Sequence, residues 1–135
     1  MSIFALRKLD EVKNGKLSFY KLEIEGECQY DEFCKEVESH GTYVKALNTI
    51  RTFMNFMAEN PGKKLPSEKF NSIKEKNNVI GYEFKKDSLR VYVLKREPDM
   101  YVVLGGYKTE QKKDISAFKR IIPKLETSTE EITFY

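Results

Sequence analysis

The sequence is poor in the residues from which many active sites are built. It contains one histidine, His40, and two cysteines, Cys28 and Cys34, too few for a zinc site or a disulfide framework. Motifs of P-loops, serine hydrolases and metal sites are missing too. We therefore expect no metal and no other cofactor, and we interpret both cysteines as reduced thiols of a cytoplasmic protein. His40 precedes Gly41 at an expected helix end, which favours a capping or surface role.

Long apolar runs are also missing. The longest run is a few residues, too short to cross a membrane. The first residues, MSIFALRKLDEVKNGK, contain no apolar signal core and carry charge from Arg7 onward, so we do not expect secretion. With 135 residues, of which 40% are hydrophobic and 33% charged, the chain is long enough for one globular domain spanning residues 1–135.

The positive charge is concentrated in one part of the chain. Residues 1–80 hold 13 Lys/Arg against 12 Asp/Glu, whereas residues 81–125 hold 11 against 6, a local net charge of +5. The last ten residues contain no Lys or Arg and 3 Asp/Glu. A local cationic excess suits a phosphate-bearing partner. The alternative is a solvated, lysine-rich surface.

The first half of the sequence predicts a hairpin followed by two helices. Two alternating stretches, residues 4–12 and 17–25, flank Asn14-Gly15, a pair that favours a β-hairpin turn. Residues 30–41 begin with acidic side chains, as at a helix N-terminus. Residues 42–59 carry an apolar stripe at helical spacing, which we interpret as core packing, formed by Tyr43, Ala46, Leu47, Ile50, Phe53, Met54 and Met57.

The second half predicts mainly strands. Residues 67–76 predict a short helix or turn. Apolar segments at 79–84, 89–94 and 101–107 are separated by short turn-like links, which indicates a three-stranded antiparallel meander.

A last helix is predicted at residues 114–125, with Asp114 as its N-cap and Pro123 at its end or at a kink. The tail, residues 128–135, predicts a further strand or a loose end. Strands and helices are grouped, so we predict an α+β fold. Its antiparallel sheet combines the N-terminal hairpin with the C-terminal meander and packs against two or three helices.

Alternation along LRVYVLKR gives the first candidate site residues. It places Leu89, Val91 and Val93 on one face of the strand. The other face then carries Arg90, Tyr92 and Arg96, with Lys95 nearby. A guanidinium suits phosphate oxygens, and a tyrosine can stack on a base or exchange a proton. The alternative is an arginine lying over an aromatic ring, a common surface pair.

The strand end VVLGGYK gives the second set. Gly105-Gly106 allows close approach of a ligand or another backbone, and Tyr107 and Lys108 follow directly. We predict that this strand end forms one rim of an RNA-phosphate site. The alternative is a β-bulge with an exposed tyrosine. Lys112 and Lys113 are either further phosphate contacts or the solvated start of the last helix, and we favour the solvated interpretation.

Residues 43–125, about 60% of the chain, resemble the RelE/HigB-like toxins of toxin–antitoxin pairs, including their phage-derived branch. The resemblance lies in the order of an amphipathic helix, a proline-bearing linker, the segments IKEKNNVIGYEFK and LRVYVLKREPDMYVVLGGYK, and the closing DISAFKRIIPKL. The sequence departs from the family after Tyr107. The family frequently has Gly-Phe-x-Lys-Lys at this point, whereas Tyr107 is followed by Lys108, Thr109 and Glu110. The N-terminal hairpin is also longer than the family's single opening strand.

The resemblance implies a RelE-like fold and an mRNA interferase activity. Tyr82-Glu83, Arg90, Gly106-Tyr107 and the final-helix arginine, Arg120, match family positions. Active members cut mRNA, commonly on the ribosome, by attack of the ribose 2′-OH on the neighbouring phosphate. Cationic side chains stabilise the developing charge, and no metal is needed. The implied partners are a cognate antitoxin, the ribosome and mRNA. We expect no membrane as a partner.

Three hypotheses follow. The first is a ribosome-dependent endonuclease in which Arg90, Tyr107 and Lys108 are catalytic. Its substrate-binding residues would be Tyr92, Lys95, Arg96, Lys112, Lys113 and Arg120. The second is a non-catalytic protein of the same fold that binds an antitoxin-like regulator or ribosomal RNA. The third is a nucleic-acid-binding regulator that acts without ribosomes. Cleavage separates the first from the second.

Overall fold

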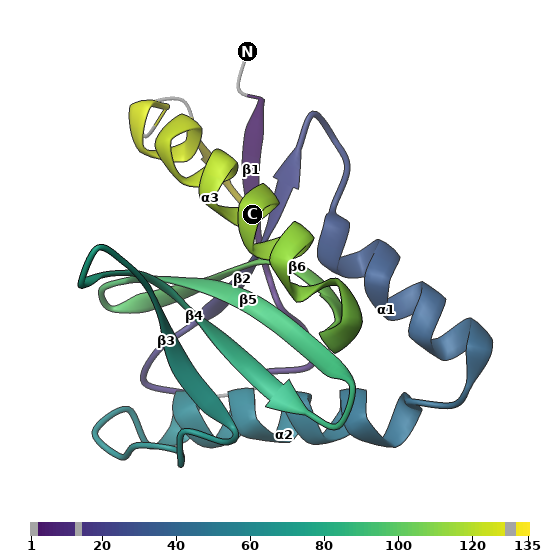
Figure 1. Cartoon of the computed structure of the whole chain (residues 1–135). Helices are drawn as coiled ribbons and strands as arrows, with labels where there is room; N and C mark the ends of the chain where they lie inside the picture. Colours follow the sequence, from purple (N-terminus) through teal and green to yellow (C-terminus); the bar gives the residue numbers. More distant parts are fainter. Residues whose placement is uncertain (1–2, 13–14, 129–131) are drawn as a thin grey trace.

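A computed structural model describes residues 3–12, 15–128 and 132–135, which form one sheet and three α-helices (Figure 1). The strands are β1 (Phe4–Lys8), β2 (Phe19–Ile24), β3 (Phe70–Glu75), β4 (Asn78–Lys86), β5 (Leu89–Arg96), β6 (Asp99–Tyr107) and β7 (Thr133–Phe134). The helices are α1 (Gln29–His40), α2 (Val44–Glu59), the short 3₁₀ turn η1 (Lys108–Glu110) and α3 (Gln111–Thr127).

The seven strands follow the order β3-β4-β5-β6-β2-β1-β7. Neighbouring strands are antiparallel except for two pairs: β2 runs parallel to β6, and β1 runs parallel to β7. The predicted α+β class is confirmed. The sheet, however, is mixed rather than antiparallel, because the hairpin joins the meander through the parallel pair β2 and β6. It is also larger than predicted, because β3 and β7 extend it at its two edges.

The predicted N-terminal hairpin is present as β1 and β2, which pair antiparallel with Leu6 opposite Leu22. The predicted turn residue Asn14 lies outside the described residues. Gly15 lies against the end of α2, where a Cβ would come within 2.6 Å of the Ala58 carbonyl carbon. The Lys16 N–H donates to the Ala58 oxygen at 2.7 Å. Gly15 and Lys16 therefore pack on the end of α2.

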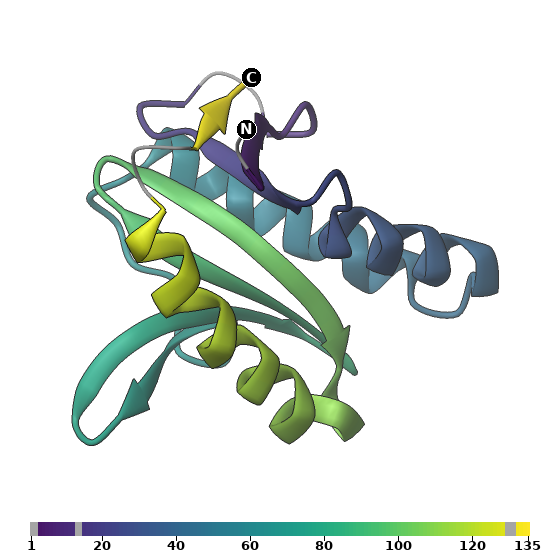
Figure 2. The same cartoon turned by 90° about the horizontal axis from the view of Figure 1, so that it is seen from above.

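Helices α1 and α2 cover one face of the sheet (Figure 2). Both were predicted. Gly41 ends α1 with φ 80°, and its N–H donates to the Val37 oxygen at 2.9 Å. The predicted stripe of α2 packs here, together with Leu89, Val91 and Val93 of β5. We call this layer the α1/α2 core.

The prediction of a short helix or turn at residues 67–76 is wrong, because this segment contains strand β3. It lies at the edge of the sheet and buries only one side chain fully, Ile73, so its apolar alternation is weak. Lys76 and Asn77 connect β3 to β4 with positive φ angles of 49° and 70°. Two consecutive positive φ angles are typical of a tight hairpin turn, and asparagine tolerates them better than most residues.

Helix α3 covers the opposite face, and Figure 2 shows the sheet between it and the other two helices. Phe118 and Leu125 are its buried residues. Glu110, not the predicted Asp114, is the N-cap, and Pro123 lies within the helix instead of ending it. Pro123 is exposed, so water can satisfy the carbonyl that its missing N–H leaves free. We call the layer between sheet and helix the α3 core.

Strand β5 is consequently buried on both faces. Every residue from Leu89 to Leu94 is buried, so the open sheet face on which the candidate site was expected does not exist over this strand. Burying one large apolar side chain fully stabilises a fold by about 1.5–3 kcal/mol, and both faces of β5 contribute in this way. Among the described residues, no helix is long and apolar enough to cross a membrane.

Candidate functional site

Arg90 lies on β5 opposite Gly106 of β6, near the turn between β4 and β5. It is only 8% exposed. Its Nη1 donates to the backbone oxygens of Asp87 at 3.0 Å and Leu89 at 2.7 Å, and its Nε has no partner among the described residues. Nη1 therefore holds the turn together, whereas Nε is buried without a partner, so only a small part of the guanidinium reaches the surface.

Tyr92 shares the α3 side of the strand with Arg90, as predicted, but it is fully buried. Its ring centroid is 6.0 Å from that of Phe118, and its hydroxyl has no hydrogen-bond partner within the described part of the chain. Burial raises the pKa of the Tyr92 hydroxyl well above its ordinary range. The expectation that Tyr92 stacks on a base or exchanges a proton is wrong, because α3 covers it.

Tyr107 lies on the opposite face of the sheet from Arg90. It pairs with Leu89, and its ring contacts Phe33 of α1 at 5.6 Å and Tyr43 at 6.1 Å between centroids. Burial, with the neighbouring Glu36 carboxylate, raises the pKa of Tyr107. The predicted convergence of Arg90 and Tyr107 on one surface is therefore wrong, since successive residues of a strand point to opposite faces.

The glycine pair accommodates helices rather than a ligand. A Cβ on Gly105 would lie 2.7 Å from Cε2 and 2.8 Å from Cγ of Phe33, on the α1 side. A Cβ on Gly106 would lie 2.8 Å from Cγ of Asp114, on the α3 side. Each glycine lets one helix approach the sheet from its own side. This is the close approach of another backbone element, which the sequence left as an alternative to ligand binding.

The cavity beside these glycines is acidic. It has a volume of about 620 Å³ and includes Gly105, Gly106, Tyr107 and one cation, Lys113. Its carboxylates are Glu27, Glu32, Glu36, Glu110 and Asp114. Burial and the neighbouring Glu110 raise the pKa of Asp114, as expected where carboxylates gather. We call this cavity the acidic pocket. Its carboxylates repel phosphate, so the prediction of an RNA-phosphate rim at this strand end is wrong.

The remaining predicted cations do not gather around Arg90. Three of them are ion-paired: Lys95 with Glu97 at 3.1 Å, Arg96 with Glu126 at 2.9 Å, and Lys113 with Glu110 at 3.3 Å. Lys108, Lys112 and Arg120 are exposed on η1 and α3. Of these, Lys108 comes nearest, because its N–H donates to the Ser88 oxygen in the turn beside Arg90.

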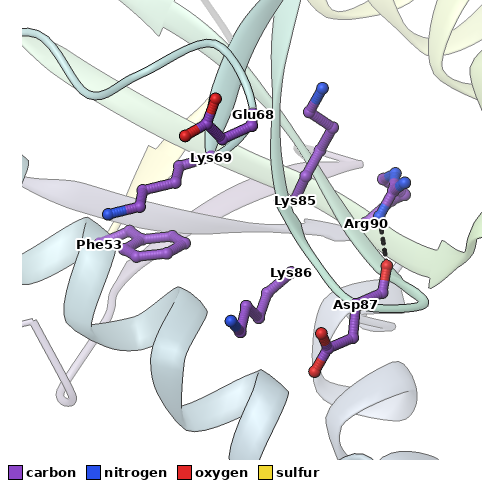
Figure 3. A pocket seen from close by; sticks show the side chains of 7 residues that line it. All are labelled: Phe53, Glu68, Lys69, Lys85, Lys86, Asp87 and Arg90. Carbon is purple, nitrogen blue, oxygen red and sulfur yellow. Dashed lines mark hydrogen bonds between the residues drawn. The ribbon is translucent and has the colours of Figure 1, made fainter.

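A different set of cations lines a cavity together with Arg90, and these cations come from both faces of the sheet. A cavity of about 400 Å³ is lined by Phe53, Glu68, Lys69, Lys85, Lys86, Asp87 and Arg90, and we call it the basic pocket (Figure 3). Lys69 extends toward the Phe53 ring, with Nζ 5.4 Å from the centroid. No described carboxylate forms an ion pair with any of its four cations. Their charges are therefore available to an anion.

A second cavity is lined by residues close in sequence to those of the basic pocket. Phe53 of the first and Met57 of the second are one turn apart on α2, and Lys69 and Phe70 are consecutive. This second cavity has a volume of about 680 Å³, and we call it the aromatic pocket. Its lining includes Lys16, Leu17, Met57, Asn60, Pro61, Gly62, Lys63, Lys64, Leu65, Phe70, Tyr82, Lys95, Glu97, Pro98 and Met100.

The two pockets hold eight Lys/Arg against three Asp/Glu, a net charge of +5 in a chain whose total is +3. We call them together the cationic edge. The sequence prediction included only Arg90 and Lys95 of its eight cations. The missed residues come from four separate segments that only the fold brings together. The adjacent pairs Lys63-Lys64 and Lys85-Lys86 were the available signal.

The net positive charge of the cationic edge attracts anions. Histidine 40 lies exposed at the end of α1 and lines neither pocket. Within the described residues, no group of three His, Cys, Asp or Glu side chains could hold a metal ion. Cys28 and Cys34 are free and buried. Comparison with family models, with curated proteins and with solved structures finds no match to this chain.

Proposed function

We propose that this protein binds RNA at the cationic edge, as a non-catalytic binding protein. The observation that carries the proposal is the local net charge of +5 on the two pockets. Lysines bind phosphates as mobile point charges, and arginine adds a directional fork. An exposed cationic surface with aromatic side chains between the charges is typical of proteins that follow a nucleic-acid backbone.

The separation of the tyrosines from Arg90 favours binding over catalysis. Cleavage by 2′-OH attack needs a group that takes a proton and a group that gives one, both within reach of the phosphate. Tyr92 lies in the α3 core and Tyr107 beside the acidic pocket. The tyrosines from which proton transfer was expected thus have no path to a phosphate bound beside Arg90.

A ribosome-dependent mRNA endonuclease is the second candidate. The observation that favours it is that Arg90 shares the basic pocket with three lysines, a set that can stabilise phosphorane charge without a metal. Lys85 or Lys86 would then act in place of Tyr107 and Lys108. The RelE-like arrangement, the cognate antitoxin and the ribosome stay predictions of the sequence resemblance.

The test of RNA binding compares two matched lysine pairs. Fluorescence anisotropy with a labelled 12-nucleotide RNA measures Kd from 50 to 300 mM salt for the wild type and for Lys85→Gln/Lys86→Gln. Each lost phosphate contact lowers the slope of log K against log salt concentration by about 0.7, so the double variant loses about 1.4. Relative to 1 M salt, where these contacts contribute little, the double variant should therefore bind about 25-fold more weakly than the wild type at 0.1 M salt. The control, Lys112→Gln/Lys113→Gln, removes the same charge beside the acidic pocket and should bind like the wild type.

Equal losses in both double variants would show that total charge, not the cationic edge, sets the affinity, and would refute the proposal. Incubating the same RNA with the protein, with ribosomes in magnesium-containing buffer and without ribosomes in EDTA, separates the two candidates. Intact RNA supports the binding function. Cleavage by the wild type that is lost in Lys85→Gln/Lys86→Gln selects the endonuclease.

A further inference from the structure

The aromatic pocket differs from the basic pocket in having an apolar wall. Phe70 of β3 and Tyr82 of β4 stack there, with ring centroids 5.1 Å apart and planes within 8° of parallel. Its volume of about 680 Å³ lies in the range of roughly 300–1,000 Å³ that is typical of ligand sites. Four exposed lysines, Lys16, Lys63, Lys64 and Lys95, line the same pocket. Only Lys95 is ion-paired with a described carboxylate.

This combination selects a ligand with a flat apolar body and an anionic group attached to it. A nucleotide meets both requirements, because the base can stack on an aromatic side chain while its phosphate meets a lysine. A base inside a duplex cannot enter such a pocket, since both of its faces are covered by neighbouring base pairs. The ligand must therefore present an unstacked base.

We propose that the aromatic pocket holds one unstacked base of a single-stranded RNA whose backbone runs on into the basic pocket. The inference rests on the proposed RNA binding and adds the strand state of the ligand. The geometry supports a continuous path, because Phe53 and Met57 are four residues apart on one helix, about 6 Å along its axis. Lys69, which lines the basic pocket, and Phe70, which lines the aromatic pocket, are consecutive residues.

Binding of matched single-stranded and duplex probes tests the inference with the wild-type protein. A 12-nucleotide RNA, the same RNA annealed to its complement and the DNA strand of the same sequence are compared at one salt concentration. Tighter binding of the single strands than of the duplex supports the inference. Equal binding of single strand and duplex, with a Lys85→Gln/Lys86→Gln variant still defective, overturns it and leaves the proposed function standing.

The variant Tyr82→Leu tests the stacking contact. It keeps apolar bulk but removes the ring, so it should weaken single-strand binding about 10-fold, the loss expected for one stacked base, and should leave duplex binding unchanged. Tyr101→Leu is the matched control. Tyr101 is also a half-buried strand tyrosine with aromatic neighbours, but it packs in the α3 core. Equal effects of the two substitutions on single-strand binding would overturn the assignment.

Photo-crosslinking keeps the test independent of variant folding. A 12-nucleotide RNA containing 4-thiouridine at every uridine position is irradiated with the wild-type protein, and the crosslinked peptides are identified by mass spectrometry. Crosslinks in the Met57–Leu65 segment or at Phe70 and Tyr82 support the inference. Crosslinks confined to the basic pocket refute it and confirm the proposed function, and crosslinks at neither pocket refute both.

Discussion

Substitution of Gly105 by alanine tests the interpretation of the glycine pair. The new methyl group would lie 2.7–2.8 Å from two carbons of the Phe33 ring, well inside normal contact distance. Phe33 is buried at 6% exposure, so the ring cannot move without shifting α1. Overpacking of this kind costs about 1–3 kcal/mol of unfolding free energy. For 135 residues the unfolding entropy is about 0.3 kcal/mol/K, so a loss of 2 kcal/mol lowers Tm by about 7 °C.

A double-mutant cycle assigns this cost to the ring. Phe33→Ala removes the ring carbons that the methyl group would meet, so Gly105→Ala in that background should be neutral or stabilise by up to about 1 kcal/mol. Chemical denaturation of the four proteins measures the coupling. Gly62→Ala is the control, because a Cβ there meets no atom within 4 Å, and it should change stability by less than about 0.5 kcal/mol. Equal costs of Gly105→Ala in both backgrounds would refute the packing role.

Three further substitutions have defined outcomes. Tyr92→Phe removes a buried hydroxyl without a partner, so denaturation should show unchanged or up to about 1 kcal/mol higher stability, with RNA binding unaltered. Arg90→Lys keeps the charge but loses the Nη1 that donates to the backbone oxygens of Asp87 and Leu89, and should cost about 1–3 kcal/mol in the same assay. Burial raises the pKa of Cys28 to about 11, so its folded form holds the proton more tightly than its unfolded form. Unfolding free energy should therefore fall as pH rises from about 9 to 11, and fall less steeply in Cys28→Ala.

Local patterns predicted the elements that are amphipathic on one face. The stripe of α2 repeats regularly and packs in the structure as predicted. The alternation of β5 correctly predicted a strand, but not that both of its faces are buried. Strand β3 was missed because an edge strand needs to bury little: Ile73 alone is fully buried. A signal for two-sided burial of β5 was present. LRVYVL is almost continuously apolar, as in strands covered on both faces. The last helix also carries apolar residues at helical spacing, Ile115, Phe118, Ile121 and Ile122, which need a surface to pack against.

The candidate site was predicted less well, because it depends on contacts between distant segments. A glycine pair in a sequence indicates close approach but does not say whether a ligand or a helix approaches. Arg90 lines a cavity together with Lys69, Lys85 and Lys86, whereas the sequence prediction assigned Lys95 and Lys108 to it. Summing charge along the chain located the excess in residues 81–125, whereas Lys16, Lys63 and Lys64 join it only through folding.

The parallel pairing of β2 with β6 sets the order in which the molecule can assemble during synthesis. Residues 19–21 pair with residues 100–102, so the N-terminal hairpin has no place in the sheet until β6 has been made. Helices α1 and α2 also emerge before β6, at a time when the central strands that cover their apolar stripes have not been made. Contacts between residues so far apart in sequence slow folding and prolong the exposure of hydrophobic surface. A nascent chain that stops before Asp99 should therefore aggregate or need a chaperone, and folding should complete only once the central strands are released.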